Sequence, residues 1–274
     1  MRMFRIREPF ASGVLYENDA RSLKHQLENC FMHKLGPKGM KPQPIIAGMV
    51  PHNSILSSGP IAAWLYSRLE RANYILLGPV HKPMKHQFAV MKDGLWKTPL
   101  GELLTDSNMA NKIAGSSTLV EFDMVPHQAE HSIEMQIPFL QYRFGNDAKF
   151  VPILVSNKFA DEGFLDNCSA VGDAIANAIK NSKDRWIVIA SSDLSSDKKF
   201  DKSTINTLLK FDGKKLFTQI KDNEMKMCGF GSIATAIVAA KKLGARKAKL
   251  LKYANASQVI KNQSSTGYAS LIFY

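Results

Sequence analysis

Short runs of consecutive apolar residues recur along the chain, and most of them are bounded by Gly, Pro or polar residues. A continuously apolar run of this length is typical of a strand that is buried on both faces of a sheet. On this basis we predict strands at residues 45–50, 73–78, 88–91, near Trp96, and at 150–155, 186–190, 248–255 and 268–273.

Segments whose apolar residues have helical spacing lie between these runs. They predict helices at residues 19–33, 60–68, 107–114, 132–142, 164–179 and 232–243, with two more within 201–221. Pro60 is expected in the first turn of its helix, where the missing N–H costs nothing. Alternating buried strands and helices indicate an α/β fold with a mainly parallel central sheet and helices on both faces. We find no linker, repeat or low-complexity segment, so residues 1–274 are expected to form a single domain.

The composition of the 274 residues, 45% apolar and 22% charged, is that of an ordinary soluble protein. Apolar runs stop well short of the eighteen residues that a transmembrane helix needs. The arginines near the N-terminus (Arg2, Arg5 and Arg7) are not followed by an apolar stretch, so a secretory signal is not expected. The three cysteines lack the spacing of a disulfide framework. We therefore predict a reduced, cytoplasmic protein without a membrane segment.

The formal net charge of +12 raises the question of nucleic-acid binding. The densest basic stretches lie at residues 198–221 and 241–252, and neither is interleaved with aromatic residues for base stacking. Lysine dominates over arginine, which suits a solvated surface better than bidentate recognition of phosphates or bases. The charge therefore predicts solubility and does not favour a nucleic-acid partner.

Metal-binding and proton-transfer side chains follow several of the predicted strands. His52 and His81 each come just after a strand, in a turn that contains proline. In open α/β sheets, ligands gather at the carboxyl ends of the strands, and imidazole is the commonest metal ligand. The two histidines therefore predict a shared metal site; the alternative is that each is a partly exposed loop residue.

Cys228 precedes Gly229 and a predicted helix, and a helix N-terminus stabilises a thiolate. This position favours a metal ligand or a nucleophile over the small buried apolar residue that a free cysteine usually is. Cys30 and Cys168 lie on the apolar faces of predicted helices, and for them the buried role is expected. We thus predict a metal site made of His52, His81 and Cys228.

Three further side chains are candidates for proton transfer or for orienting the ligands. His131 and Glu134 are three residues apart at the start of a predicted helix, so they would share one face. The alternative is that Glu130 and Ser132 cap this helix while His131 packs against it. Asp193 follows a strand after Ser191 and could ligate a metal or orient a histidine; its alternative is a helix N-cap.

Taken in order, these segments resemble the MEMO family, which includes the AmmeMemoRadiSam system protein B. The similarity extends over nearly the whole chain. It is carried by short motifs in the family's order: Arg7-Glu8-Pro9 with Gly13-Val14-Leu15-Tyr16, Pro51-His52, Gly78-Pro79-Val80-His81, Glu130-His131-Ser132-Ile133-Glu134-Met135-Gln136-Ile137-Pro138-Phe139-Leu140, Ser191-Ser192-Asp193-Leu194 and Cys228-Gly229.

The resemblance implies a fold like that of the class III extradiol dioxygenases, with His52, His81 and Cys228 at the family's metal positions. It implies iron or copper as the metal. Independently of the resemblance, imidazole and thiolate donors also suit zinc. For some relatives it implies binding of phosphopeptides, and for others a companion radical SAM system. It names no reaction.

The chain departs from the family pattern at several positions. The family's PHAGY is here Pro51-His52-Asn53-Ser54-Ile55, and the histidine that follows its SSD motif is replaced by Ser196. Where the family has CGRxP, the arginine is replaced by Phe230. An acid/base imidazole and an anion-binding guanidinium are therefore missing, and whether the protein is an enzyme stays open at this point.

Four hypotheses follow. The first is a metal-binding protein with redox or dioxygenase-like chemistry on an unidentified small molecule or peptide. The second is a non-enzymatic protein that binds a partner or a phosphopeptide through a vestigial pocket. The third, nucleic-acid binding, rests on charge alone. The fourth is an enzyme that uses Cys228 as nucleophile and His52 or His81 as base.

Overall fold

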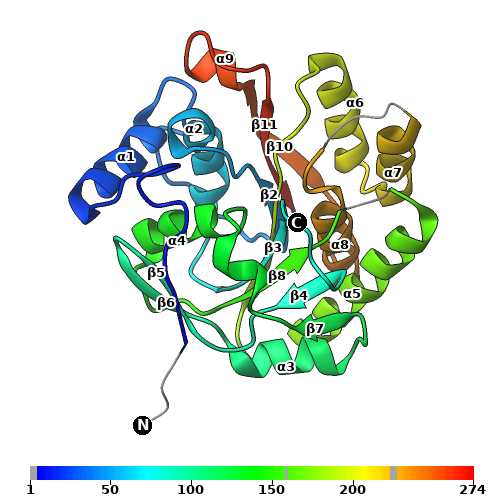
Figure 1. Cartoon of the computed structure of the whole chain (residues 1–274). Helices are drawn as coiled ribbons and strands as arrows, with labels where there is room; N and C mark the ends of the chain where they lie inside the picture. The colour runs from blue at the N-terminus through cyan, green and yellow to red at the C-terminus, as the bar shows by residue number, and fades with distance from the viewer. Residues whose placement is uncertain (1–4, 158–159, 223–226) are drawn as a thin grey trace.

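An eight-stranded sheet runs through the middle of the molecule (Figure 1). The computed structural model describes residues 5–157, 160–222 and 227–274. In spatial order the strands are β10 (Ala248–Asn255), β11 (Gly267–Phe273), β2 (Ala47–Val50), β9 (Trp186–Ser191), β3 (Asn73–Pro79), β8 (Phe150–Val155), β4 (Phe88–Val90) and β7 (Val120–Phe122). The four central strands β2, β9, β3 and β8 are mutually parallel, whereas β11 and β4 run antiparallel to their central neighbours. The predicted α/β fold with a mainly parallel centre is confirmed, as a mixed sheet.

A second, smaller sheet has the order β1 (Ile6–Arg7), β5 (Leu95–Thr98) and β6 (Gly101–Leu104). The sequence predicted β5 only, as a strand near Trp96. The other two strands are too short to give a pattern of alternating or continuous apolar residues. β1 matters for function because it carries Arg7 into the interior, where this side chain is 1% exposed.

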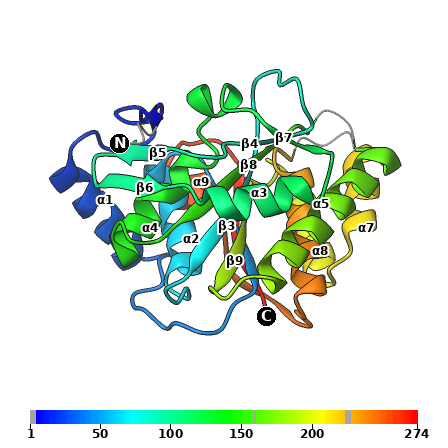
Figure 2. The ribbon, with the colours of Figure 1, turned by 90° about the horizontal axis from the view of Figure 1, so that it is seen from below.

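Helices cover both faces of the large sheet, as predicted (Figures 1 and 2). One face carries α1 (Ala20–Met32), α2 (Ile55–Tyr66) and α4 (Ile137–Phe144). The other carries α3 (Ser107–Gly115), α5 (Glu162–Lys180), α6 (Lys198–Leu209), α7 (Gly213–Asp222) and α8 (Phe230–Lys242). The short α9 (Ala256–Val259) follows β10. In the part of the chain described above, no helix is long and apolar enough to cross a bilayer.

Successive residues of the central strands enter opposite cores, which explains why the strands are apolar throughout. In β3, Tyr74 and Leu76 pack with the helices α1, α2 and α4, whereas Ile75 and Leu77 pack with α5 and α8. A strand alternates its side chains between the two faces, so burial on both sides requires an unbroken apolar run. β2 pairs with β11, so segments near the beginning and the end of the chain share this one sheet.

Two helices begin several residues away from their predicted first residues, and in each case a proline is involved. The helix α2 begins at Ile55, so Pro60 lies inside it and not in its first turn. The carbonyl of Ser54 accepts hydrogen bonds from the N–H groups of Ser57 and Ser58, which starts the helix ahead of the proline.

The helix predicted at 132–142 is α4, and it begins only at Ile137. Pro138 occupies its first turn, where a proline loses no hydrogen bond, whereas a helix starting at residue 132 would place it in the interior. The preceding residues form two 3-10 turns, η1 (Pro126–Ala129) and η2 (Glu134–Gln136), and His131 lies between them outside any helix.

His127, in η1, is fully buried and its Nε2 lies 3.2 Å from the carbonyl oxygen of Ala89. Burial lowers the pKa of His127 to about 3, and the nearby Arg7 adds to this, although the bond to Ala89 opposes it. Between that value and the ordinary pKa of about 6.5, the unfolded chain binds a proton that the folded chain does not. His127 therefore destabilises the fold as the pH falls below 6.5.

We expect the free energy of unfolding to fall by up to about 1.4 kcal/mol per pH unit between pH 6 and 4 on account of His127 alone. Urea unfolding over this range, compared with His127→Gln, isolates the contribution because the other titrating groups are shared. The variant should show the shallower dependence on pH. Equal slopes would show that His127 takes up its proton without unfolding.

Candidate metal centre

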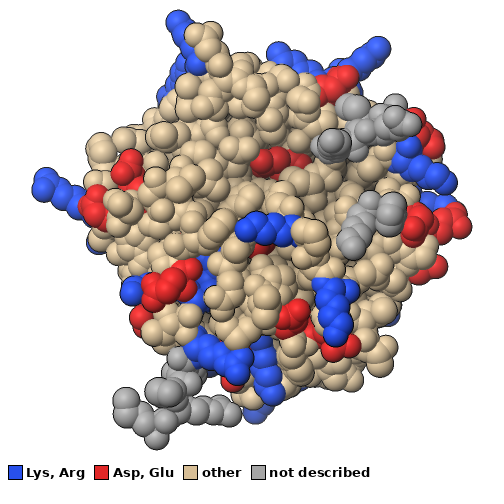
Figure 3. Space-filling model, viewed as in Figure 1, with Lys and Arg blue, Asp and Glu red and all other residues tan. Residues whose placement is uncertain are grey.

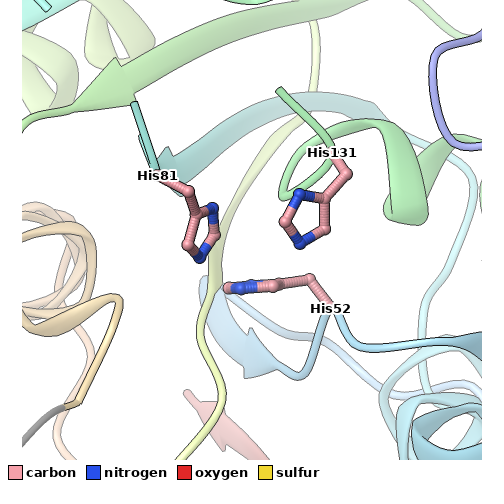
Figure 4. Close-up of side chains that lie close together, drawn as sticks. All are labelled: His52, His81 and His131. Atoms are coloured by element: carbon pink, nitrogen blue, oxygen red, sulfur yellow. The ribbon is translucent and has the colours of Figure 1, made fainter. Parts of the chain in front are cut away.

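Three histidines from separate parts of the chain converge at one point (Figure 4). His52 follows β2, His81 follows β3, and His131 comes from the turn between η1 and η2. One ligand nitrogen from each ring lies within 4.8 Å of the other two. The predicted meeting of His52 and His81 beyond the ends of two parallel strands is therefore seen, although β9 lies between β2 and β3, and His131 joins them.

The spacing of the rings fits a common ion. Their centroids are 5.2 Å apart for His52 and His81, 5.4 Å for His52 and His131, and 4.6 Å for His81 and His131. Imidazoles that bind one tetrahedral ion through nitrogen at about 2.0 Å have ring centres roughly 5 Å apart. The three rings can thus hold one metal ion after small adjustments.

Glu130 lies behind two of these rings and fixes their orientation. Its carboxylate is 3.0 Å from Nδ1 of His81 and 3.3 Å from Nδ1 of His131. It also accepts hydrogen bonds from the backbone N–H groups of His81, His131 and Ser132. A carboxylate that holds Nδ1 of a ligand histidine leaves Nε2 for the metal.

The charges at this point favour ionised Glu130. Burial raises the pKa of Glu130, but the hydrogen bond and charge of His81, with His131 and Ser132, outweigh it and lower the pKa to about 2. For His81, burial lowers the pKa and Glu130 raises it, with a net rise. For His131, burial prevails over Glu130 and the pKa falls.

His52 is the most deeply buried of the three, at 2% exposure. Its Nδ1 lies 2.9 Å from Oγ of Ser191, and its backbone N–H donates to Asp193. Burial, followed by the proximity of His131 and His81, holds the pKa of His52 well below its usual value. His52 is therefore neutral, which is the form that ligates a metal.

Cys228 lies at the edge of the cluster, next to His52. Its Sγ is 3.5 Å from Nε2 of His52, and the backbone N–H of Asp193 donates to the sulfur at 3.3 Å. Nitrogen and sulfur ligands of one tetrahedral ion, at about 2.0 and 2.3 Å from it, are also roughly 3.5 Å apart. Burial and the charge of Asp193 raise the pKa of the thiol to about 12, so the metal-free protein holds a thiol and not a thiolate.

Two glycines let the segments of the site approach one another. A Cβ on Gly78, in β3, would lie 2.5 Å from Oγ of Ser132, next to His131. A Cβ on Gly229 would lie 2.4 Å from Cβ of Ser192. Any larger residue at either position would push the His131 turn or the Cys228 segment away from the cluster.

Asp193 lies beside the cluster as a hydrogen-bond acceptor. Its Oδ1 accepts from the N–H of His52 at 3.0 Å, and its Oδ2 from the amide of Asn53 at 3.3 Å. Burial raises the pKa of Asp193 despite these bonds. The predicted role in proton transfer stays a prediction, while orientation of the His52 backbone is evident. Ser196, three residues later, is exposed.

Glu134 does not share a site with His131 in the way that the sequence suggested. Residues 131–133 are not helical, so a spacing of three residues does not place the two side chains on one helix face. The Glu134 carboxylate forms a salt bridge with Arg7 and accepts hydrogen bonds from Tyr16 Oη and the N–H groups of Phe10 and Ala11. These contacts indicate a structural role, and the predicted proton-transfer role of Glu134 finds no support in them.

Glu130 is the residue of the site that sequence reasoning missed. The sequence predicts Glu130 only as a helix cap, because it precedes the predicted helix. The signal that could have identified it is its position next to His131, since a carboxylate beside a ligand histidine commonly orients the ligands. Its contact with His81, 49 residues earlier in the chain, could not be read from spacing.

The basic side chains do not form a single patch on the face shown in Figure 3, where Lys and Arg are scattered among Asp and Glu. The prediction that the basic charge serves a solvated surface and not a nucleic acid stays a prediction.

Comparison with known proteins places the chain in a family. The model of the family described as Memo-like protein matches residues 7–272. A MEMO1 family protein of Pyrobaculum aerophilum is 36% identical over 98% of this chain and 99% of its own length. Those of Methanococcoides burtonii and Nitrosopumilus maritimus are 34% and 32% identical over similar shares. A crystal structure of an uncharacterized protein from Escherichia coli K12 has a TM-score of 0.52 over 84% of this chain and all of that chain, at 10% identity, which is a likeness of fold alone. By its sequence over nearly its full length, the chain belongs to the MEMO family.

Proposed function

We propose that the protein binds a transition-metal ion through His52, His81 and His131, with the Cys228 thiolate as a fourth ligand. The observation that carries the proposal is the convergence of the three imidazoles, with ligand nitrogens within 4.8 Å of one another. Neutral imidazole rings gain little stability from contact with one another in a buried site, so a cluster of three is better explained by binding of an ion.

The donor types select the metal. Imidazole suits iron, copper and zinc, and a thiolate shifts the preference towards softer ions. The carboxylates of Glu130 and Asp193 are engaged with N–H groups of the ligand residues and are not among the ligand atoms that converge. Iron or copper is favoured, as in the resemblance discussed above, and zinc also fits this set.

The sequence predicted His52, His81 and Cys228 as ligands and His131 as a proton-transfer group. In the arrangement proposed here His131 is a ligand, since its ring centre is 5.4 Å from that of His52 and 4.6 Å from that of His81, distances similar to the 5.2 Å between His52 and His81. A bound iron or copper ion would supply redox chemistry, including chemistry like that of dioxygenases. Asp193, whose backbone N–H donates to Cys228 and whose buried carboxyl group has a raised pKa, would then be the group that holds a proton.

Elemental analysis of anaerobically purified protein tests the proposal. We expect close to one equivalent of metal in the parent and almost none in a His52→Ala/His131→Ala variant, because removing two of three imidazoles leaves no adequate site. His25→Ala, which removes an exposed histidine of α1, is the matched control and should retain the metal. Metal retained by the double variant, or absent from the parent after reconstitution, would refute the site.

The role of Cys228 needs its own measurement. Cobalt(II) bound to the parent should show an intense near-ultraviolet band from sulfur-to-metal charge transfer, and Cys228→Ser should lose it while still binding cobalt. A parent spectrum without this band would leave a site of three histidines with a free thiol. If Cys228→Ser loses the band and His131→Ala binds cobalt as well as the parent does, the ligands are the predicted set of His52, His81 and Cys228.

A second candidate function is binding of a partner or a phosphopeptide without catalysis. It is favoured by Ser196 and Phe230, which replace the family's histidine and arginine. A parent protein that holds no metal would move the assignment to this function. The substrate or peptide and a companion radical SAM protein stay predictions from the family resemblance.

A further inference from the structure

A buried hydrogen-bond network surrounds the side of His52 that faces away from the other histidines. It contains Ser191, Gln136 and Tyr66, which are all at most 1% exposed. His52 reaches it through Nδ1, 2.9 Å from Oγ of Ser191. Its other ring nitrogen, Nε2, lies beside Cys228. The network therefore contacts one ring nitrogen only.

The orientation of the Gln136 amide is fixed by its neighbours. Its Nε2 lies 3.2 and 3.1 Å from the carbonyl oxygens of Pro51 and Ser132, and carbonyls can only accept. Its Oε1 accepts the hydroxyl of Tyr66 at 2.7 Å. A flipped amide would place oxygen against two carbonyl oxygens. The nitrogen therefore points at Ser191 and donates to its Oγ at 3.0 Å.

The hydroxyl of Ser191 has a single hydrogen, and its place is set by a second contact. Oγ of Ser191 is 2.8 Å from the carbonyl oxygen of Ser132. Two oxygens at this distance need a hydrogen between them, and only the serine can supply it. Ser191 thus donates to Ser132 and has no hydrogen left for His52, so Nδ1 of His52 must be the donor.

We infer that Ser191, held by Gln136 and Tyr66, fixes neutral His52 as the tautomer protonated at Nδ1 and so presents the lone pair of Nε2 to the metal. Ser191, Gln136 and Tyr66 are positioning residues, since none of them contacts the place where the rings converge. The inference rests on the proposed function for its purpose, but the tautomer exists in the metal-free protein too.

The network determines which ring nitrogen of His52 is free to bind the metal. Glu130 does the same for His81 through a carboxylate, whereas Ser191 does it for His52 through a neutral hydroxyl.

The test is NMR of the imidazole nitrogens in chelator-treated protein labelled with nitrogen-15 in histidine. Signals of His52 are assigned by their loss in His52→Gln. We expect a pyrrole-type Nδ1 and a pyridine-type Nε2 for His52 in the parent. The opposite pattern, or an average of the two, would overturn the inference once His52→Gln has supplied the assignment.

Ser191→Ala supplies the second measurement. Its His52 should lose the preference for the Nδ1–H form, and its affinity for Zn²⁺, measured against a competing chelator, should fall by about 10–100-fold. Ser270→Ala is the matched control, because Ser270 is equally buried and donates its hydroxyl to the carbonyl of Ile61. Parental tautomer and affinity in Ser191→Ala would overturn the inference.

The two proposals fail differently. A parent protein with the Nδ1–H tautomer that binds no metal refutes the proposed function and upholds the role of Ser191. A parent that binds metal with His52 in the Nε2–H form upholds the function and refutes that role.

Discussion

Replacing Arg7 with methionine should lower the free energy of unfolding by about 3–5 kcal/mol, the cost of leaving a buried charge without its partner. Arg7 and Glu134 form a salt bridge in which both side chains are 1% exposed. The Arg7 guanidinium also donates to the carbonyl oxygens of His127 and Glu130 and lies 4.4 Å from the centre of the Trp96 ring. A methionine fills much of the volume but replaces none of these donors.

Urea unfolding at pH 7 measures this effect, and a double-mutant cycle isolates the pair. In Arg7→Met/Glu134→Met the unpaired charge is gone, so the double variant should be more stable than the sum of the two single losses predicts. Arg7→Lys keeps the charge but not the planar arrangement of donors, and should fall between the parent and Arg7→Met. Additive losses would contradict a direct coupling of Arg7 and Glu134.

The same arginine links the fold to the metal centre. It binds the backbone of the segment from His127 to Glu130, which leads directly to His131. Zn²⁺ affinity of Arg7→Met, measured well below its unfolding midpoint, should therefore also fall. An unchanged affinity would show that Glu130 is held in place without Arg7.

Glu130→Gln should weaken binding of Zn²⁺ by about 10–100-fold, the usual effect of removing a group that orients metal ligands. The carboxylate accepts from Nδ1 of His81 and from the backbone at three positions. A glutamine can keep the bonds on one oxygen, but its amide nitrogen would then face the N–H groups of His81. Nδ1 of His81, which contacts one carboxylate oxygen at 3.0 Å and the other at 3.1 Å, would keep one acceptor but face a donor in place of the other. The orientation that directs Nε2 to the ion would therefore weaken.

Competition with a chelator of known affinity measures this change. Glu121→Gln removes an equal charge from an exposed position in β7 and should leave the affinity unchanged. A fall of the same size in both variants would point to long-range charge, and no fall in Glu130→Gln would show that His81 and His131 need no orientation by Glu130.

Most strands and helices could be predicted from the chain alone because their signals are local. β8 and the helices α1, α3 and α5 lie within two residues of their predicted bounds. Their apolar residues face a core directly, so the pattern reports the packing. The predictions were wrong where proline competes with that pattern, as at Pro60 and Pro138.

For the site, the sequence by itself determined which side chains are available and that His52 and His81 each follow a buried strand of one βαβ unit. Parallel strands bring their carboxyl ends to the same edge, so that part followed from a local rule. Only the tertiary structure decided that His131 joins them, that Glu130 orients two rings and that Glu134 pairs with Arg7. The insertion of β9 between the strands that precede His52 and His81 was also decided by the tertiary structure. The contacts of Glu130 with His81 and of Glu134 with Arg7 join residues 49 and 127 positions apart, whereas Glu130 and His131 are adjacent. Which residues contact one another depends on how the turn between η1 and η2 folds over the strand ends. The sequence of that turn has no periodic pattern, because it forms no continuous helix or strand.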